Sequence, residues 1–318
     1  MNASQGIELS ILIVSWNTRE ILRDCLNSVR WATNGRAAEV IVVDNASEDG
    51  SADMVEREFP EVRLVRSETN TGFAAGNNIA LRMARGRWLL LLNSDTVVLG
   101  DVLWSSIEYL RENPAVGAMG CRVLNPDLTM QPTCFRYPSV LNLALLTSGL
   151  GRVPWPRTLG RYQMRGWQRD DEREVDVVTG CYLLLRREVY EAVGGLDESF
   201  FFCGEETDWC RRIRAAGWQL RFAPVGEIIH LGNASGRKWS SRRDVLLTTG
   251  LVRLHFKHGG PLRARVVWAM LWGFNASRWL GWSLASLFRT DARVRREHFR
   301  GVLSHFGDVW ARASSCVA

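Results

Sequence analysis

Three short apolar segments of the sequence each end in side chains that can bind a ligand. A leucine run at 89–92 leads directly into Asn93, Ser94 and Asp95. Burying a lone carboxylate costs several kcal/mol, so Asp95 needs a partner. A divalent cation that carries phosphates would be one, whereas a turn or a helix cap would need no ligand. The other two segments end in Ser15, Trp16 and Asn17, and in Asp44 and Asn45, where an Asx turn equally explains Asp44.

A second group of acidic residues opens a predicted helix at 205–216. Glu205, Glu206 and Asp208 lie in its first turn, where negative charge suits the helix dipole. Glu206 also shares a helical face with apolar residues. These are Trp209, Cys210 and Ile213. A carboxylate that faces inward beside a cleft can act as a general base. Burial raises the pKa of such a group and a helix N-terminus lowers it, so both outcomes stay open.

Other residues that commonly bind metals give a weaker signal. His230 ends a short apolar segment, where a lone histidine is more often structural than a ligand. The seven cysteines, an odd number with scattered spacing, fit neither a disulfide framework nor a zinc motif. Free cysteines are typical of a reducing compartment, and the N-terminus resembles no signal peptide. We therefore expect a cytoplasmic location.

Strand-like and helix-like segments alternate along the first part of the chain. Apolar runs predict strands at 9–16, 39–47, 61–67 and 88–92, with helices at 18–31, from 51, and within 70–86. This alternation is typical of an α/β fold with a mainly parallel central sheet flanked by helices. In such sheets ligands bind beyond the carboxyl ends of the strands. We therefore expect the polar residues that follow the strands to cluster in space.

Two common phosphate-binding motifs are missing from the sequence. No Gly-x-Gly-x-x-Gly follows the first predicted strand, and no Walker A pattern occurs. The first absence disfavours a dinucleotide-dependent dehydrogenase. The 318 residues, 46% apolar and 23% charged, are sufficient for one large α/β domain with an appendage.

The C-terminal part of the chain differs in charge from the rest. Residues 241–318 hold 13 Lys and Arg against 4 Asp and Glu, whereas residues 1–240 hold 27 against 30. We predict a main domain at 1–240 and a basic, Trp-rich appendage of two or three helices at 241–318. The positive charge indicates an anionic partner, and nucleic acid is disfavoured because no binding motif for it is present.

The tryptophans of this appendage favour a membrane surface as that partner. Segment 266–288 is long enough to span a bilayer, but Arg278 near its middle makes crossing costly. Tryptophans at headgroup depth with flanking arginines are typical of a helix that lies in the interface. The alternative is that the same face packs on the protein or closes a dimer. The residues predicted to share this face are Trp268, Trp272, Asn275, Trp279 and Trp282.

Seven motifs in one order resemble the family 2 glycosyltransferases of the GT-A fold, especially the bacterial rhamnosyltransferase-like branch. They lie within residues 8–235 and are ILIVSWN, EVIVVDNASEDGS, NTGFAAGNN, LLLLNSD, GGLDESFF, GEETDWCRRIRAAGW and the later His230. The resemblance implies an inverting enzyme that moves a sugar from a nucleotide-sugar to an acceptor hydroxyl. The branch implies dTDP-L-rhamnose as donor and a glycan or polyprenyl-diphosphate-linked acceptor in cell-envelope polysaccharide synthesis. Such an acceptor implies a peripheral location of the protein on the inner face of the cytoplasmic membrane.

The same resemblance assigns residues to the donor. By position, Ser15, Trp16 and Asn17 would shape the nucleotide pocket, and Asp44 would bind the base or ribose. The loop at 70–78 would approach the nucleoside and the diphosphate. Its donor-contacting residues would include Asn70, Gly72 and Asn77.

It also assigns a metal site and a base. Asn93, Ser94 and Asp95 match the DXD motif, with Asp95 as a ligand for Mg²⁺ or Mn²⁺ and His230 as a further metal contact. Glu206 matches the usual catalytic base, with Asp208 in reserve. Two positions depart from the family pattern. Asn93 replaces the first aspartate of DXD, which bears on metal dependence, and Glu206 stands where aspartate is common.

Two other functions share parts of this pattern. A non-catalytic sugar-nucleotide-binding or membrane-scaffold protein could use the same fold, but the acids at 205–208 disfavour it. A nucleotidyltransferase needs a basic, glycine-rich triphosphate loop soon after the first strand. The segment SWNTRE at 15–20 contains no glycine, so this alternative is also disfavoured.

Overall fold

The computed structural model describes residues 6–152, 157–232 and 241–315. The chain forms two compact units that are not continuous in sequence. Unit 1 comprises Met1–Phe135, Trp167–Glu198 and Glu206–Ser235, and unit 2 comprises Arg136–Gly166, Ser199–Glu205 and Gly236–Ala318. The basic appendage thus groups with two earlier segments of the chain. A division into domains at residue 240 stays a prediction.

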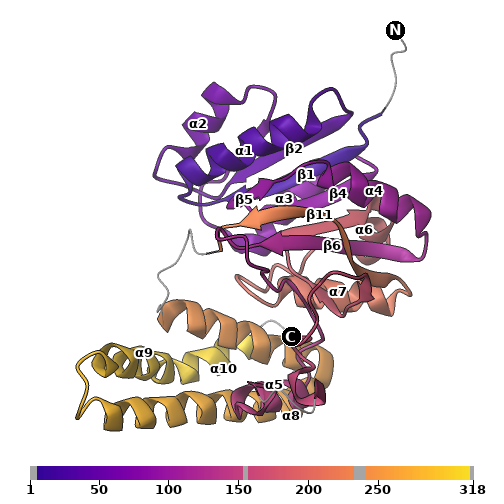
Figure 1. The fold of residues 1–318 in the computed structure, drawn as a ribbon. Coiled ribbons are helices and arrows are strands. Elements are labelled where there is room, and N and C mark those ends of the chain that lie inside the picture. The colour runs from indigo at the N-terminus through magenta and orange to yellow at the C-terminus, as the bar shows by residue number, and fades with distance from the viewer. Residues whose placement is uncertain (1–5, 153–156, 233–240, 316–318) are drawn as a thin grey trace. The chain divides into compact units, whose positions relative to one another are not determined.

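Unit 1 contains a nine-stranded sheet whose first half is parallel (Figure 1). The order β3-β2-β1-β4 places the earliest strand, β1, between β2 and β4, and all three pairings are parallel. These elements are β1 (Leu9–Ser15), α1 (Arg19–Thr33), β2 (Ala38–Asp44), α2 (Ser51–Glu58), β3 (Arg63–Arg66), α3 (Gly72–Met83) and β4 (Trp88–Leu92). The alternation predicted from the sequence is confirmed, because helices connect the parallel strands as crossovers.

The second half of the sheet is mixed. β10 runs antiparallel to both β4 and β6, β11 runs parallel to β6, and β5 and β8 pair antiparallel with β11. β7 and β9 form a separate two-stranded sheet. The bounds are β5 (Thr96–Val98), α4 (Val102–Glu112), β6 (Val116–Leu124), β7 (Cys134–Phe135), β8 (Arg173–Glu174), β9 (Val177–Val178), β10 (Tyr182–Arg186), α6 (Arg187–Val193), α7 (Glu205–Ala215) and β11 (Gln219–His230).

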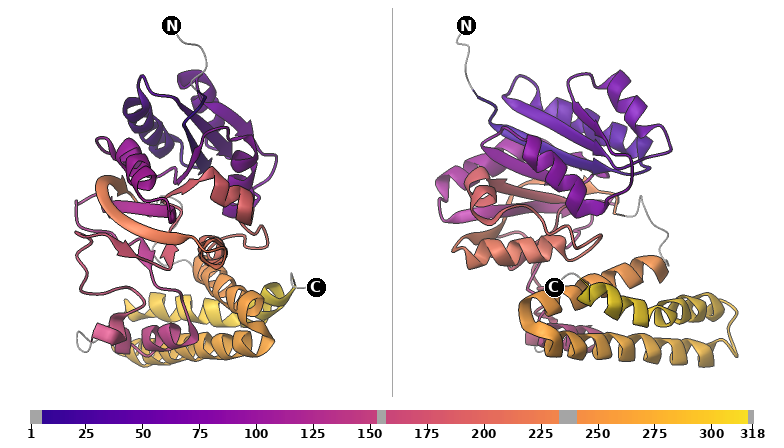
Figure 2. Two further views of the ribbon diagram at one scale, coloured as in Figure 1. Left: turned by 90° about the vertical axis from the view of Figure 1, so that its right-hand side faces the viewer. Right: turned by 180° about the vertical axis from the view of Figure 1, so that it is seen from behind.

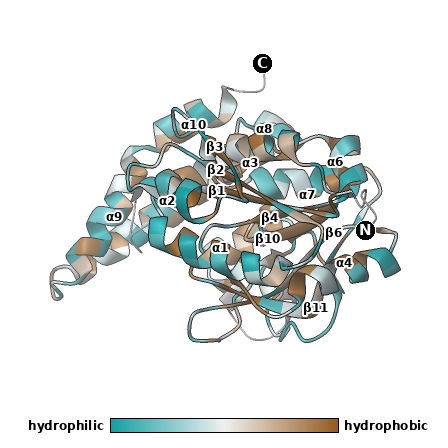
Figure 3. Ribbon diagram, turned by 90° about the horizontal axis from the view of Figure 1, so that it is seen from above, coloured by the Kyte–Doolittle hydropathy of each residue, from teal (hydrophilic) through white to brown (hydrophobic). Residues whose placement is uncertain are grey.

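The core of unit 1 lies on both faces of this sheet. Every residue of β4 and β10 is buried, and the strands are hydrophobic along their length (Figure 3). Helices cover the sheet through apolar faces with helical spacing, as Leu22, Cys25, Leu26 and Val29 do in α1. A Cβ on Gly76 of α3 would lie 2.9 Å from Val14 of β1, so only glycine permits this close approach. Such packing fixes where the strand ends point.

Unit 2 is helical. It contains α5 (Val140–Thr147), α8 (Ser241–Ala285), α9 (Ala292–Ser304) and α10 (Phe306–Ser314), and short 3-10 turns at Leu150–Arg152 and Arg157–Gly160 follow α5. Figure 2 shows α9 running beside the second half of α8. α8 is broken at Gly260, whose φ of 75° is left-handed, and Pro261 opens its second half. The predicted helical character of the appendage is confirmed, and its described residues form α8, which is broken into two halves, α9 and α10.

The predicted tryptophan face of α8 is partly covered within unit 2, with Trp272 still 47% exposed, and its placement on a membrane stays a prediction. The Trp268 indole donates to the Phe306 carbonyl at 3.0 Å and packs against Phe306 and Trp310 of α10. Asn275 is buried, and the Arg295 guanidinium of α9 lies 4.4 Å from the Trp282 ring centroid. Residues of α9 and α10 therefore cover part of this face. Sequence periodicity alone could not reveal this packing. Within the described residues, no helix is both long and apolar enough to cross a bilayer.

Candidate active site

The ends of β1 and β4 are joined by a chain of hydroxyl groups. Ser15 Oγ lies 2.9 Å from Thr18 Oγ1, and Thr18 donates to Ser94 Oγ at 3.3 Å. Two of the predicted donor-binding segments, 15–17 and 93–95, therefore meet at one edge of the sheet. Trp16 and Asn17 are exposed there, and Asn17 adopts a left-handed φ of 53°. The turn presents their side chains outward from the end of β1.

Asp44 at the end of β2 both closes a turn and keeps one oxygen without a partner. Its Oδ2 accepts a hydrogen bond from the Ser47 amide at 3.0 Å, which is the Asx turn anticipated from the sequence. Its Oδ1 is buried and accepts no hydrogen bond from the described residues. A buried carboxylate oxygen of this kind is costly to leave unsatisfied. Asp44 is thus suited to accept a hydroxyl or amide from a ligand.

Asn45 ties the strand end to the loop at 70–72. Its Nδ2 donates to Asn70 Oδ1 at 3.0 Å and to the Gly72 carbonyl at 3.1 Å, and its Oδ1 accepts from the Thr71 amide at 3.0 Å. Gly72 has a φ of 85°, which glycine adopts without strain. Asn45 was expected at a strand end, but its link to the loop at 70–72 joins segments 25 residues apart and was not predicted. It brings Asn70 and Gly72 to the edge that carries Asp44.

Asp95 and His230 come together because β5 pairs with the end of β11. The ladder sets His230 opposite Thr96, and the Leu231 amide donates to the Asp95 carbonyl at 2.9 Å. The Asp95 Oδ1 atom then lies 3.1 Å from His230 Nε2, and Asn93 Nδ2 lies 3.2 Å from the same nitrogen. Three residues predicted for the metal site therefore converge on one point.

The hydrogen bonds of Gln131 decide which nitrogen of His230 carries its proton. Gln131 Nε2 donates to Asn125 Oδ1 at 2.8 Å and to the His230 carbonyl at 3.3 Å, which orients its Oε1 towards the ring. Oε1 lies 2.6 Å from His230 Nδ1, so Nδ1 must donate. In the neutral ring, Nε2 then presents a lone pair to the Asp95 carboxylate. That lone pair can accept from Asn93 Nδ2 or bind a cation held beside the Asp95 carboxylate, so this donor set fits a divalent metal.

The protein supplies only part of a coordination shell at this point. Among the described residues, no group of three or more His, Cys, Asp and Glu side chains gathers as a metal cage. Mg²⁺ typically combines one or two carboxylates with substrate phosphates and water. Asp95 and His230 therefore fit a cation that arrives with a diphosphate better than a permanently bound one. Gln131 was missed from sequence because it lies 99 residues from His230.

The Glu206 side chain is held in position by Gly180, which lies just before β10. The Gly180 amide donates to Glu206 Oε1 at 3.1 Å. A Cβ at Gly180 would lie 2.8 Å from the Phe73 ring of α3 and 3.1 Å from Glu206 Oε1, so a side chain is excluded. Burial raises the pKa of Glu206, and the Gly180 amide only partly offsets this. The open question from the sequence is thus answered, since burial outweighs the lowering effects.

Cys181 links this carboxylate to the metal-site residues. Its carbonyl accepts from the Asn93 amide at 3.4 Å, and Tyr182 pairs with Leu92 across the antiparallel ladder. Burial and, to a smaller extent, the nearby charges of Glu206 and Asp95 raise the pKa of the Cys181 thiol to about 12. The base candidate and the metal candidate therefore flank the same thiol.

Two other predicted site residues have internal roles. Asp208 has no exposed surface, and its carboxylate accepts from Arg212 Nε at 2.8 Å. Asn77 is buried and donates to the Phe73 carbonyl of its own helix at 2.9 Å. The geometry therefore favours Glu206 over Asp208 as the base, and a donor contact of Asn77 stays a prediction.

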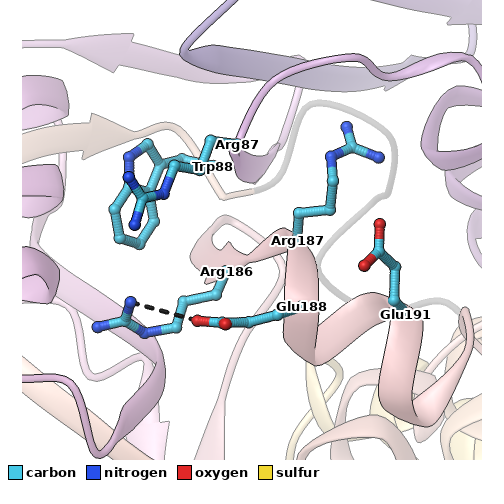
Figure 4. Close-up of a pocket in the computed structure, with 6 residues that line it drawn as sticks. All are labelled: Arg87, Trp88, Arg186, Arg187, Glu188 and Glu191. Carbon is cyan, nitrogen blue, oxygen red and sulfur yellow. Dashed lines mark hydrogen bonds and ion pairs between the residues drawn. The ribbon is translucent and has the colours of Figure 1, made fainter.

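A separate cavity lies at the opposite end of β4. It has a volume of about 210 Å³ and is lined by Arg87, Trp88, Arg186, Arg187, Glu188 and Glu191 (Figure 4). Trp88 begins β4, whereas Asn93 and Asp95 follow its end. Arg187 donates to the Gly86 and Ala84 carbonyls, so its charge is largely used within the protein. This cavity is not part of the strand-end site.

The fold is that of the GT-A glycosyltransferases. The structure is similar to that of the mannosyltransferase PcManGT from Pyrobaculum calidifontis, solved with GDP-Man and Mn²⁺. The TM-score is 0.54 at 16% identity, with 99% of this chain and 89% of that chain covered. At this level of identity the likeness concerns the fold.

The family follows from the sequence. The model of glycosyl transferase family 2 matches residues 10–194, and the chain belongs to this family of glycosyltransferases. It is 27% identical over 281 residues to the N-acetylglucosaminyl-diphospho-decaprenol L-rhamnosyltransferase of Mycobacterium tuberculosis, covering 82% of this chain and 89% of that protein. It is 24% identical over 178 residues to the rhamnosyltransferase WbbL of Escherichia coli K12, covering 54% and 65%. These relatives match the rhamnosyltransferase-like branch indicated by the motifs.

Proposed function

We propose that this glycosyltransferase moves L-rhamnose from dTDP-L-rhamnose to a hydroxyl of a lipid-linked glycan, with inversion at the anomeric carbon. The convergence of Asp95, His230 and Asn93 beside the donor loop supports a diphosphate-bearing donor. The names of the relatives support rhamnose and a polyprenyl-diphosphate-linked acceptor. The product would serve cell-envelope polysaccharide synthesis at the inner face of the cytoplasmic membrane.

The strand-end residues bind and orient the donor. Asp44 Oδ1 accepts a hydrogen bond from the ribose or base, and the loop held by Asn45 closes over the nucleoside. Asp95 and His230 Nε2 would hold Mg²⁺ or Mn²⁺, with the Asn93 amide group beside the same nitrogen. A bound divalent cation offsets the charge that develops on the leaving diphosphate. The replacement of the first DXD aspartate by Asn93 lowers the charge of the site.

Glu206 removes the proton of the acceptor hydroxyl. As the proton moves to the carboxylate, the acceptor oxygen bonds to the anomeric carbon and the bond from that carbon to the diphosphate oxygen breaks. Attack opposite the leaving group inverts the configuration, and dTDP departs with the bonding electrons. A raised pKa makes Glu206 a better proton acceptor near neutral pH than an ordinary glutamate. The reaction requires no covalent sugar–enzyme intermediate.

A transfer assay over a panel of nucleotide-sugars tests this function. Purified protein is incubated with dTDP-L-rhamnose, UDP-GlcNAc, UDP-galactose or GDP-mannose and a short-chain polyprenyl-diphosphate glycan, with and without EDTA. We expect transfer with dTDP-L-rhamnose only, and its loss in EDTA. Faster transfer from another donor would refute the rhamnose assignment, and undiminished transfer in EDTA would refute the metal.

The variant Asp95→Ala tests the proposed metal ligand directly. We expect it to abolish turnover and to remove the part of dTDP affinity that depends on Mn²⁺, measured by calorimetry. Asp53→Ala, which removes an exposed carboxylate of α2, should change neither. Equal Mn²⁺-dependent affinity in Asp95→Ala and wild type would show that Asp95 is not a metal ligand.

A further inference from the structure

The two units carry opposite net charge. Unit 2 holds 20 Lys and Arg against 5 Asp and Glu, a net charge of +15, whereas unit 1 holds 20 against 29, a net charge of −9. The net charge of the whole chain is only +6, because the charges of the two units largely cancel. A field of this strength attracts an extended anionic surface and repels a second copy of the same unit.

Unit 2 also carries most of the exposed large apolar side chains. Among the described residues there are fifteen of these, and only Trp16, Trp31 and Leu128 belong to unit 1. The second half of α8 and the turn after it hold seven. These seven are Leu262, Val266, Trp272, Leu280, Leu284, Leu287 and Phe288. Exposed apolar surface of this extent marks an interaction site.

Most of these residues form one line along α8. We define the α8 stripe as Leu262, Val266, Ala269, Gly273, Leu280, Leu284 and Leu287, which recur at spacings of three, four and seven and are all exposed. The opposite face of the same helix, with Ala264, Val267, Leu271 and Asn275, is buried in unit 2. Leu287 and Phe288 at the end of the stripe are 73% and 88% exposed. The stripe runs for about 38 Å at 1.5 Å per residue.

The centre of the stripe is open. A Cβ built on Gly273 would meet no atom within 4 Å, so nothing in the described protein covers this position. No charged residue belongs to the stripe, whereas exposed arginines lie beside it and beyond its end. Arg263 and Arg265 are near its start, and Arg289 and Arg293 follow its last residue. An apolar line bordered by cations is the pattern of a helix lying in a lipid interface.

We propose that the α8 stripe lies in the headgroup region of an anionic lipid bilayer, with α8 parallel to the membrane plane. The charge of +15 favours this occupant over a second copy, because two such units repel each other. The contact surface differs from the predicted tryptophan face, which α9 and α10 partly cover. The proposal extends the proposed function, since a lipid-linked acceptor would be reached from this surface.

Charge-matched glycine substitutions test the stripe in the full-length chain. Gly273→Glu places a carboxylate in the stripe, and Gly307→Glu places the same charge on α10, where a Cβ also meets nothing within 4 Å. Binding is measured by co-sedimentation with vesicles of phosphatidylglycerol and phosphatidylcholine at low salt. We expect Gly273→Glu to weaken binding at least about tenfold and Gly307→Glu to weaken it no more than about twofold. Gly273→Leu should strengthen it.

Other results would overturn the proposal. These are equal weakening of vesicle binding by Gly273→Glu and Gly307→Glu, wild-type binding to pure phosphatidylcholine vesicles as tight as to the anionic vesicles, or no vesicle binding by the wild type. A change of oligomeric state in Gly273→Glu, seen by sedimentation without a change in vesicle binding, would assign the stripe to a second copy instead. Thermal unfolding of each variant checks the fold.

A failure of the membrane proposal can be distinguished from a failure of the proposed enzymatic function. Transfer to a water-soluble, short-chain acceptor should be unchanged in Gly273→Glu, whereas transfer to the same glycan on a long-chain lipid in vesicles should fall with binding. Loss of both would overturn the proposal, because the substitution would then act on the catalytic unit. An inactive wild type that still binds vesicles through the stripe would refute only the proposed function.

Discussion

The Asp208 carboxylate accepts a hydrogen bond from Arg212 Nε at 2.8 Å, one turn further along α7. The other nitrogens of Arg212 donate to the Val193 and Gly195 carbonyls, both at 2.7 Å. The pair thus fastens the helix that carries Glu206 to the loop after α6. In the proposed function this pair positions the base, which explains a buried acidic residue close to Glu206.

The same loop is held to the donor-binding helix by Asn78. The Leu196 amide donates to Asn78 Oδ1 at 2.9 Å, and Asn78 Nδ2 donates to the Leu196 carbonyl at 2.8 Å. A Cβ on Gly195 would lie 2.3 Å from Asn78 Oδ1, so this contact requires glycine. α3 and α7 are therefore linked through one loop, and the donor loop and the base keep a fixed relationship.

Removing one partner of the Asp208–Arg212 pair should destabilise the protein. Asp208→Ala leaves a largely buried guanidinium without its anion, which costs about 3 kcal/mol. Asp53→Ala breaks an exposed pair with Arg66 and should cost less than about 1 kcal/mol. Urea unfolding measures both. Losses of similar size would show that Asp208 does not anchor α7.

Glu206→Gln should separate binding from catalysis. The amide keeps the shape and still accepts from the Gly180 amide, but it cannot take a proton. We expect donor affinity near that of wild type and a kcat lower by at least about 10²-fold. Asp208→Asn is the comparison. If Asp208→Asn were inactive and Glu206→Gln active, with both variants folded, Asp208 would be the base.

The raised pKa of Glu206 also predicts an effect on stability with a definite sign. Above its folded-state pKa the wild type carries a buried carboxylate, which disfavours folding; below its unfolded-state pKa the group is neutral in both states. Glu206→Gln should therefore melt at a higher temperature than wild type at pH 8. The difference should vanish towards pH 4. Calorimetric scans across this range test it, and a constant difference would argue against a buried charge.

Activity should follow the same ionisation. A base that must be ionised loses activity as it is protonated, and burial moves this acid limb of kcat/KM above the ordinary glutamate value of 4.5. The pH dependence of transfer to a soluble acceptor measures it. Asp53→Asn, far from the base in sequence and exposed, should leave the limb in place. An acid limb below pH 4.5 would contradict the assignment.

The elements of unit 1 were predictable because local composition determines them. The apolar run 88–92 is the strand β4 with the same bounds, Asp44 ends β2 and Asn93 follows β4, as expected. Parallel topology then brings those ends to one edge. The motif order added the metal and base assignments, which position in sequence alone left open.

The contacts that orient the site were not predictable, because they join distant segments. Gln131 and His230 are 99 residues apart, and Gly180 and Glu206 are 26 apart. The tryptophans of α8 show a further limit. Periodicity finds the residues that share a helical face, but only the packing of α9 and α10 determines which face is covered.

The Gln131–His230 bond gives the most specific prediction about the metal site. With Gln131 Oε1 as acceptor, His230 Nδ1 keeps its proton and Nε2 is available to a cation. Gln131→Met has similar length but accepts no strong hydrogen bond, so the ring can rotate or take the other tautomer. We expect Mn²⁺ affinity in the presence of dTDP to fall about 10- to 100-fold, measured by the loss of the free Mn²⁺ signal in electron paramagnetic resonance.

Gln131→Glu retains an acceptor at the same position and should bind Mn²⁺ within a few-fold of wild type. Gln168→Met, at an exposed glutamine of unit 1, controls for the substitution itself. If Gln131→Met and Gln131→Glu weaken Mn²⁺ binding equally, the acceptor at Gln131 does not fix the histidine, and His230 is not held as a metal ligand in the way these distances indicate.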